Sequence, residues 1–393
     1  MGTSAEIYEY EKTLDRTLDK VRRSNIVDTN KLLIENFSRY LFAEGLSLGR
    51  IIKYLIQIRK IAEGLRKPFS ELTKEDILDI VQKIERRKDY TEWTKHDYKL
   101  TLKKFFKFLK GTEDYPEEVK WIRLTTHNNN QLPEELLTED EVKLMADVAR
   151  TPRDKALILV LYESGCRIGE LLSIKIRNVR FDEYGAVLTV TGKTGMRRVR
   201  IIASAPALAT WLDNHPFKGK PDSPLWVSIG TRNRDGLLKY RAVSEVLKKV
   251  AKEAGINKRV YPHLFRHSRA TKLANYLTEA QLKQHFGWVQ SSDMASIYVH
   301  LSGRDVDKAL LKLHGIEVND EEREEQFNVR ECLRCKAKNS PIAKFCNTCG
   351  LPLDLKTAME LEKRKKEFIK TVITPEVIEK MIEEKVKQII EKR

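Results

Sequence analysis

The chain has 393 residues, of which 41% are hydrophobic and 33% charged, and its 73 Lys and Arg against 57 Asp and Glu give a net charge of +16. At about 150 residues per domain this length favours two or three domains, and the composition excludes wholesale disorder. The positive charge favours a polyanionic partner such as nucleic acid, although the Lys/Glu-rich surface of a heat-adapted protein would give a similar balance.

The sequence also limits the compartment. Its longest apolar run, Ala156 to Tyr162, is far shorter than the ~20 residues of a membrane-spanning helix. No charged-then-apolar signal pattern opens the chain, so we expect a soluble, cytoplasmic protein. Four of the five cysteines form one tight group and Cys166 stands alone, which suits a metal site in a reducing compartment better than a disulfide framework.

The N-terminal third is predicted to be a polar tail over residues 1–22 and a helical domain over residues 23–112. Apolar residues recur there at helical spacing, and Thr73 with Asp76 three residues later predicts a capped helix start. A fourth helix is apolar on one side and carries on the other side Lys99, Lys103, Lys107 and Lys110. This row could follow a DNA phosphate backbone, and a solvated outer face explains it about equally well.

Residues 113–136, which follow Gly111 and contain Pro116, Pro133 and three consecutive Asn, are predicted to form a linker, and residues 137–316 a second domain. Its first helix has a capping box formed by Thr138 and Glu141. An apolar helix then ends at Gly165. Further on, two β-branched segments, Val187–Val190 and Val199–Ile202, flank a pair of glycines and predict a β-hairpin.

Three positions in this domain carry chemistry that a solvated surface does not need. Arg167 lies in the turn between two apolar helices, where a guanidinium is costly unless it holds an anion. His263 and Arg266 share one face of a helix that Pro262 can begin. Tyr298 follows later. Each signal alone is weak, since a single Tyr is usually packed in a core and a His/Arg pair usually lies on a solvated face.

Taken in order, Arg167, the His263-x-x-Arg266 box and Tyr298 resemble the tyrosine recombinase superfamily of phage integrases and Xer proteins. The resemblance covers roughly residues 25–314 and is weaker in its N-terminal part. It implies a mainly α fold with a small β component (α+β). A helical, SAM-like core-binding domain would clamp DNA, and a catalytic domain of the DNA breaking-rejoining type would follow it.

The resemblance extends to further positions. Lys193, in the predicted hairpin turn, falls where the family keeps its mobile catalytic lysine, and Glu170 falls on its accessory acidic position. Trp288 stands where most relatives carry a second His, although some members have Trp there. His285 is therefore a rival for a polar role, and we favour Trp288 as a packing residue and an indole N–H donor to phosphate.

The residues also suggest a mechanism. Attack on a phosphodiester builds negative charge on its nonbridging oxygens, and Arg167 and Arg266 can fork onto them without a metal ion. Tyr298 would be the nucleophile and His263 the candidate base. The resemblance implies that Lys193 protonates the departing 5′-oxygen. The resulting 3′-phosphotyrosine preserves the ester, so rejoining needs neither metal nor ATP. We interpret two other histidines, His267 and His300, as structural.

These residues favour a site-specific recombinase or integrase acting on double-stranded DNA. The resemblance implies a homotetramer on DNA that exchanges strands through a Holliday junction. Two alternatives remain open. A type IB topoisomerase-like enzyme would nick and reseal one strand, and a catalytically silent DNA-binding regulator would keep only the fold.

The last part of the chain carries a metal-binding pattern. After an acidic linker over residues 317–328, a zinc ribbon is predicted over residues 329–353, with two Cys-x-x-Cys knuckles formed by Cys332, Cys335, Cys346 and Cys349. So small a module lacks a core, so a structural zinc ion should supply its folding energy. Residues 354–393 are predicted to form an amphipathic helix that packs against another subunit or folds back on its own chain.

Overall fold

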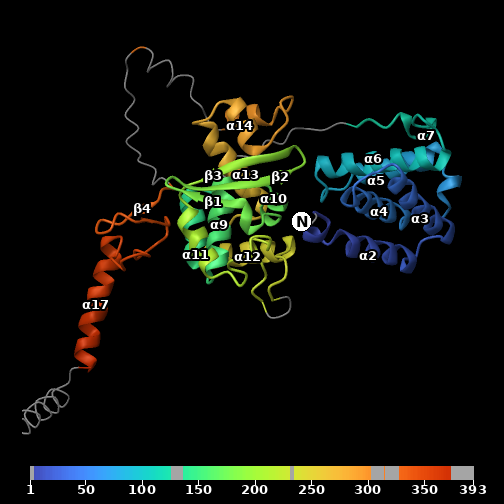
Figure 1. Cartoon of the computed structure of the whole chain (residues 1–393). Coiled ribbons are helices and arrows are strands. Elements are labelled where there is room, and N and C mark those ends of the chain that lie inside the picture. Colours follow the sequence, from blue (N-terminus) through green and yellow to red (C-terminus); the bar gives the residue numbers. More distant parts are fainter. Residues whose placement is uncertain (1–3, 125–135, 231–233, 302–313, 315–326, 373–393) are drawn as a thin grey trace, which may run out of the picture. The chain divides into compact units, whose positions relative to one another are not determined.

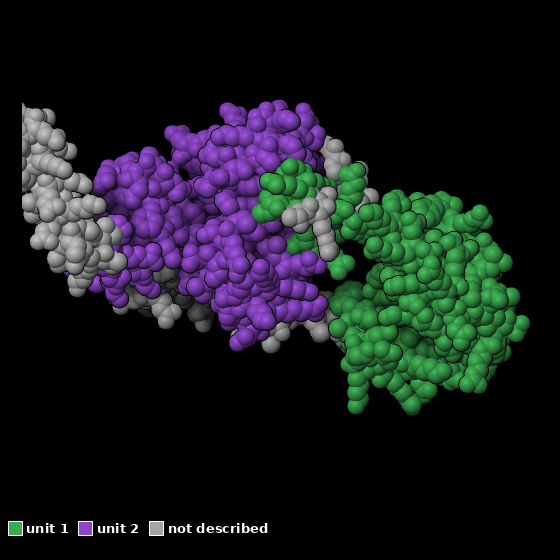
Figure 2. Space-filling model, turned by 90° about the horizontal axis from the view of Figure 1, so that it is seen from below, with its two compact units in different colours: residues 1–132, 227–242 green, residues 133–226, 243–393 purple. Residues whose placement is uncertain are grey.

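The computed structural model describes residues 4–124, 136–230, 234–301, 314 and 327–372. The chain forms two compact units (Figure 2). One comprises residues 1–132 and 227–242, and the other comprises residues 133–226 and 243–393.

The first unit is helical. Its elements are α1 (Ser4–Tyr8), α2 (Tyr10–Arg23), α3 (Asp28–Ala43), α4 (Leu48–Ala62), the 3-10 turn η1 (Phe69–Glu71), α5 (Lys74–Glu85), α6 (Glu92–Lys110) and α7 (Glu117–Lys120) (Figure 1). The capping box at Thr73 is confirmed in both halves, because its hydroxyl accepts from the Asp76 N–H and the Asp76 carboxylate accepts from the Thr73 N–H. Phe37, Leu55 and Phe105 are fully buried at the centre of the unit.

The prediction of a polar tail over residues 1–22 is wrong. Ile7, Leu14 and Val21 lie seven residues apart and are buried, and the latter two belong to the hydrophobic core of the first unit. Charged residues between them cover the outer face of α2, so the composition alone resembles a tail. The predicted linker over residues 113–136 is also partly wrong, because Val119 and Ile122 are buried in the same core, while residues 125–135 lie outside the described ranges.

The predicted row of phosphate-binding lysines on α6 is wrong for at least two members. Lys99 is 6% exposed, and its ammonium donates to Glu85 at 2.7 Å. Lys103 is 7% exposed and donates to the carbonyls of Lys120 and Ile122 at 3.2 and 3.1 Å. The long lysine stem packs against apolar surface while its charge reaches a partner, so helical spacing could not reveal this burial.

The same helix places the other two lysines differently. Lys110 pairs with Glu118 at 2.7 Å, and Lys107 is half-buried. The four ammonium groups therefore do not line one exposed face, and α6 itself gives no support to the predicted contact with DNA.

The second unit contains a small sheet among helices. Its elements are α8 (Glu139–Val148), α9 (Pro152–Ser164), α10 (Ile168–Leu172), η3 (Ile176–Asn178), β1 (Val179–Asp182), β2 (Gly185–Gly192), β3 (Gly195–Ile201), α11 (Ala205–Asp213), α12 (Tyr240–Glu253, whose first turn clusters with the other unit), α13 (Pro262–Ala274), α14 (Glu279–Phe286) and α15 (Met294–Leu301). The strands are antiparallel in the order β1-β2-β3, with Gly192 opposite Gly195 at the hairpin. The predicted hairpin is confirmed, and β1 adds a strand that the sequence analysis did not identify.

Helix α9 is the centre of this unit. Its residues from Ala156 to Ser164 are all buried, and it contacts α8, α11, α13 and β3. Two predicted helix boundaries are confirmed, namely the start of α8 and the end of α9. Thr138 and Glu141 form the capping box of α8, and Gly165 ends α9 with a left-handed φ of 56°. A helix buried all round holds the turn that follows it in a fixed place.

One buried carboxylate fixes the C-terminal end of α9. Glu163 is 6% exposed and accepts the N–H groups of Ile202, Ala203 and Ser204 at 2.7–2.9 Å, together with the Ser204 hydroxyl at 2.6 Å. These donors lie between β3 and α11, so the carboxylate joins the sheet to the end of α9.

The C-terminal region comprises β4 (Arg330–Glu331), β5 (Lys338–Asn339) and α17 (Leu355–Val372). The first part of the region predicted as an amphipathic helix, residues 354–393, contains α17, and residues 373–393 lie outside the described residues. Within the described ranges, none of the helices combines the length and apolarity needed to cross a membrane. The fold is mainly α with a small β component, as predicted.

Replacing Glu163 tests the joint between α9 and the sheet. Glu163→Ala should lower the free energy of unfolding by about 2–3 kcal/mol, because buried N–H donors lose their acceptor. Glu163→Gln keeps one acceptor oxygen and should cost less. Urea unfolding monitored by circular dichroism measures both, and the exposed Glu279→Gln serves as control. A Glu163→Ala midpoint equal to that of the control would contradict this role.

Candidate active site

Arg266 occupies a fully enclosed position on the second turn of α13. It is 2% exposed, and its Nη1 and Nη2 donate to the carbonyls of Gly165 and Phe286 at 2.8 and 2.7 Å. Its guanidinium also lies 5.0 Å from the ring centre of Phe286 and 5.5 Å from that of Trp288. Burial and the nearby Arg167 charge lower the pKa of Arg266 to about 10, so it remains a cation at neutral pH.

Arg167 lies at the start of α10 and is paired with Glu170. Its Nη1 donates to Glu170 Oε1 at 2.9 Å, and its backbone N–H donates to Oε2 at 3.1 Å. Glu170 is 5% exposed and also accepts from Arg197 Nη2 at 2.8 Å. Although burial opposes ionisation, hydrogen bonds and charges from Arg197 and Arg167 hold the pKa of Glu170 below its ordinary value. One carboxylate thus serves two guanidiniums.

Tyr298 lies on α15 with its phenol inside the same unit. The residue is 3% exposed, and its ring stacks on that of Trp288 with a 5.3 Å centroid separation and a 2° interplanar angle. Burial raises the pKa of Tyr298 to about 12. Its hydroxyl makes a hydrogen bond with Nδ1 of His267. The phenol is therefore neutral and is held by an imidazole.

His267 is the residue whose contact the sequence analysis missed. The sequence predicts a structural role for His267 and makes His263 the candidate base, but His267 is the hydrogen-bond partner of the Tyr298 hydroxyl. The two imidazoles are in contact at 4.6 Å between ring centres, almost perpendicular to each other. The only sequence signal for a role of His267 is its position directly after Arg266 in the same helix. Helical spacing alone cannot connect His267 to Tyr298.

His263 lies at the exposed start of α13. Partial burial of its ring, together with the charges of its neighbours His267, Arg266 and Arg167, lowers the pKa of His263 to about 4. Burial and the charge of Arg266 also lower the pKa of His267. Both imidazoles are therefore neutral at pH 7 and can accept a proton or a hydrogen bond.

Lys193 lies in the turn between β2 and β3, and its side chain is exposed. The neighbouring Thr194 hydroxyl donates to the Gly287 carbonyl at 3.1 Å, which brings the hairpin tip to the residue before Trp288. His285, the alternative to Trp288, contributes its carbonyl to Arg197. The side chain of His300 lies outside the described residues.

The arrangement favours an anion next to a nucleophile. Arg167, Arg197 and Arg266 carry three positive charges, and the carboxylate of Glu170 neutralises one of them. Arg266 uses two of its five N–H donors on carbonyls, so donors remain for a ligand. A tetrahedral phosphate bound by such groups would lie beside the phenol, where charge formed during attack is stabilised.

A second candidate site is formed by Cys332, Cys335, Cys346 and Cys349, whose sulfur atoms all lie within 4.8 Å of one another. The Sγ atoms of Cys332 and Cys349, and those of Cys335 and Cys346, are 3.5 Å apart. Tetrahedral zinc with Zn–S bonds of ~2.3 Å requires S···S separations of about 3.8 Å. The four thiols fit that requirement.

The two Cys-x-x-Cys knuckles also share one backbone conformation and hydrogen-bond pattern. The N–H of Cys332 donates to the Ala337 carbonyl at 2.9 Å, and that of Cys346 donates to the Leu351 carbonyl at 2.8 Å. Lys336 and Gly350, each one residue after a knuckle, have left-handed φ values of 59° and 71°. Two equivalent knuckles that face each other are what a four-thiolate metal site requires.

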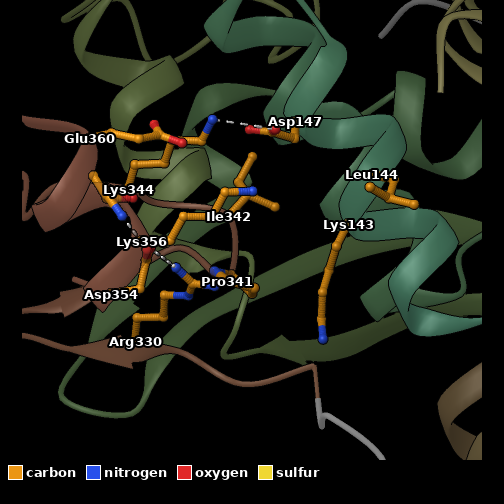
Figure 3. Close-up of a pocket in the computed structure, with 11 residues that line it drawn as sticks. Lys143, Leu144, Asp147, Arg330, Pro341, Ile342, Lys344, Asp354, Lys356 and Glu360 are labelled. Carbon is orange, nitrogen blue, oxygen red and sulfur yellow. Dashed lines mark hydrogen bonds and ion pairs between the residues drawn. The ribbon is translucent and has the colours of Figure 1, made fainter. Parts of the chain in front are cut away.

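Figure 3 shows a hollow between α8 and the cysteine module, by which we mean residues 329–353. It contains none of the residues of the arginine–tyrosine site or of the four-cysteine site. Its charged groups are largely matched. Arg330 pairs with Asp354 at 3.0 Å, and Lys344 lies 3.8 Å from Asp147 (Figure 3). The Lys344–Asp147 contact joins the cysteine module to α8. With its charges matched in this way, the hollow offers no built ligand site among the described residues.

Comparisons with known proteins agree with this geometry. A sequence model of the phage integrase family matches residues 135–304. The chain is 30% identical over 298 residues to tyrosine recombinase XerA of Pyrococcus horikoshii, an alignment that spans 75% of this chain and 97% of that protein.

Solved structures share the fold. XerH site-specific recombinase bound to palindromic difH substrate, in a post-cleavage complex, matches 78% of this chain and 98% of its own with a TM-score of 0.54 and 18% identity. A lambda integrase tetramer bound to a Holliday junction matches 70% of this chain and 78% of its own, also with a TM-score of 0.54 and 18% identity.

The lowered pKa of His263 predicts how stability depends on pH. Because its folded pKa is about 4 and its ordinary value is 6.5, the unfolded chain takes up this proton first as the pH falls. The contribution of neutral His263 to stability is present above pH 6.5 and is lost between pH 6.5 and 4.

The side chain in His263→Gln does not titrate, so this variant should lose less stability than the parent chain between pH 6.5 and 4. Urea unfolding at several pH values measures the difference, and NMR titration of labelled histidine gives the pKa directly. An ordinary pKa near 6.5 at His263 would refute the prediction.

Proposed function

The chain belongs to the phage integrase family of tyrosine recombinases, and from this membership we propose that it cuts and rejoins double-stranded DNA at specific sites with Tyr298 as nucleophile. One observation carries the assignment. The ring of Tyr298 stacks on Trp288, and the guanidinium of Arg266 lies over the same indole. A nucleophile and an anion-binding group therefore pack against the same indole of one chain.

In the proposed reaction, the phenol oxygen of Tyr298 attacks the scissile phosphorus, and the bond from phosphorus to the 5′-oxygen breaks. Arg167 and Arg266 hold the nonbridging oxygens and stabilise the charge that develops on them. The product is a 3′-phosphotyrosine and a free 5′-hydroxyl. The reverse attack by a 5′-hydroxyl of another strand completes the exchange, since the phosphotyrosine has kept the ester.

Protons move through one histidine and the hairpin lysine. We assign the first acceptance of the phenol proton to His267, because its Nδ1 contacts the hydroxyl and its lowered pKa leaves the ring unprotonated at neutral pH. His263, neutral and at the exposed rim, is left to bind the phosphate. Lys193 donates a proton to the departing 5′-oxygen. Trp288 aligns the phenol, and Glu170 orients Arg167.

The assembly is inferred from relatives. The lambda integrase tetramer on a Holliday junction supports a homotetramer of this chain on DNA. The first unit would be the core-binding domain that clamps the duplex. Its contacts with DNA come from residues other than the buried Lys99 and Lys103. DNA as the substrate and thiolates as ligands favour the reducing cytoplasm as the site of action.

The four cysteines would hold a structural zinc ion. Four thiolates complete a tetrahedral coordination and leave no open position for substrate. The ion would supply the folding energy of residues 329–353, and no step of strand exchange involves it. The reaction itself needs neither a metal ion nor ATP.

Tyr298→Phe should bind DNA and form no covalent complex, because the attacking oxygen is missing. We expect adducts that survive denaturation to fall by about 10³-fold or more. The measurement is covalent trapping on fragmented duplex DNA, followed by sequencing of the trapped fragments, which also gives the recognition site. Tyr276→Phe, at a position that is 65% exposed, is the matched control and should trap DNA normally.

Normal adduct formation by Tyr298→Phe would remove Tyr298 as the nucleophile. A parent chain that traps no DNA would support a silent regulator instead. A plasmid carrying two copies of the trapped sequence separates the remaining alternative, because a recombinase yields recombinant products and a type IB topoisomerase-like enzyme only relaxes supercoils.

Cys346→Ser tests the metal site. The variant should lose the zinc ion that the parent chain retains, because three thiolates bind the ion much less tightly than four. Native mass spectrometry measures the metal content, and limited proteolysis should cut residues 329–353 faster. Leu333→Ser, in the first knuckle and 85% exposed, should keep the metal. A metal-free parent chain would contradict the assignment.

A further inference from the structure

Arg197 is a guanidinium of the site that neither the sequence analysis nor the mechanism above uses for chemistry. It lies on β3, four residues after Lys193 and opposite Val190 of β2. Its side chain is 11% exposed, whereas Arg198 and Arg200 on the same strand are exposed. The strand therefore turns one arginine inward, toward Glu170.

Its contacts join three segments of the second unit. Nε donates to the carbonyl of His285 at 2.9 Å, at the end of α14. Nη2 donates to Glu170 Oε2 at 2.8 Å, on α10, and lies 3.9 Å from Cys166 Sγ. Since Glu170 Oε1 accepts from Arg167, the two arginines are linked through a single carboxylate.

Two glycines make room for this arrangement. A Cβ on Gly287 would lie 2.7 Å from Nη1 and 3.0 Å from Cζ of Arg197, and Gly287 has a left-handed φ of 62°. A Cβ on Gly192 would lie 2.3 Å from Glu170 Oε1. Any larger residue at either position would displace the pair, so the local sequence is fitted around it.

The same guanidinium is not optimally satisfied. Among the described residues, its buried Nη1 has no hydrogen-bond partner. Burying an unpaired donor is unfavourable, so stability alone is a poor explanation for an arginine here. A better explanation is that Arg197 holds the surrounding segments in position.

The hairpin tip has a second anchor. Thr194, the residue after Lys193, donates to the carbonyl of Gly287 at 3.1 Å. Arg197 and Thr194 thus fasten β3 and the hairpin turn to two carbonyls of the same segment, those of His285 and Gly287. Lys193 itself is exposed and lies between β2 and these two anchors.

We propose that Arg197 is a positioning residue for strand cleavage, which fastens the Lys193 hairpin to the Arg167–Glu170 turn and to the end of α14. This inference rests on the function proposed above. Arg197 thereby connects the hairpin that carries the proton donor for the leaving group to the segments that surround the phenol. Arg197 touches no reacting atom and acts through Lys193.

The chemistry of the leaving group makes this testable. When the bond between phosphorus and the 5′-oxygen breaks, Lys193 gives its proton to that oxygen. Sulfur at the same bridging position leaves as a thiolate, because a thiol has a pKa of about 8.5 and an alcohol ionises far less readily. A loss that arises from a misplaced Lys193 should therefore disappear on a 5′-bridging phosphorothiolate duplex.

The experiment measures single-turnover formation of the covalent complex at saturating DNA, on oxygen and sulfur versions of the trapped sequence. Arg197→Gln and Arg197→Lys should cleave the oxygen duplex about 10–100-fold more slowly than the parent chain. Both should cleave the sulfur duplex within a few-fold of the parent rate. Their DNA dissociation constants should stay within about twofold.

Two further variants keep the test decisive. Thr194→Val removes the other anchor at an exposed position and should show a smaller loss that sulfur also restores, even if Arg197 variants fold poorly. Arg200→Gln removes the same charge from the same strand, where Arg200 pairs with Asp182 on the surface, and should cleave both duplexes normally.

The inference is overturned if Arg197 and Thr194 variants cleave the oxygen duplex at the parent rate, or if they are equally slow on both duplexes. The second result would mean that Arg197 acts through Arg167 or through folding. Failure of the parent chain to form any covalent complex would overturn the proposed function itself, and is therefore distinguishable from either result.

Discussion

A buried guanidinium needs acceptors, and those that Arg266 finds are the backbone carbonyls of two chain turns that also carry reactive groups. The Gly165 carbonyl lies two residues before Arg167, and the Phe286 carbonyl lies two residues before Trp288. Satisfying this one side chain therefore brings α13 together with the α9–α10 turn and with the segment that packs on Tyr298. The acceptors are main-chain atoms, so the arrangement depends on backbone geometry rather than on flexible side chains.

Glu163 and Glu170 extend this principle with charge. Glu163 accepts three backbone N–H groups between β3 and α11, and so fixes the end of α9 just before the Arg167 turn. Glu170 accepts from two arginines, one on each side. Each carboxylate is buried and accepts several hydrogen bonds, including some from a distant segment of the chain, which makes a buried charge tolerable. The elements of the second unit are joined at the residues that the proposed chemistry uses.

Local patterns predicted the parts of the fold that local physics determines. Capping boxes at Thr73 and Thr138, the glycine stop at Gly165 and the hairpin between β2 and β3 are all present. Patterns failed where a long side chain or a distant contact decides. Lys99 and Lys103 have helical spacing that fits an exposed face, yet their ammonium groups reach buried partners. The partnership of His267 with Tyr298 spans 31 positions, and nothing in either local sequence specifies it.

The unequal number of charges around Glu170 has a consequence for the free protein. Three arginines share one acid, so their mutual repulsion is only partly offset, and burial limits how well water screens it. A bound polyanion would relieve that repulsion as well as make new contacts. Bound duplex DNA would then stabilise the folded state, and the protein would unfold at a higher temperature with DNA than without it.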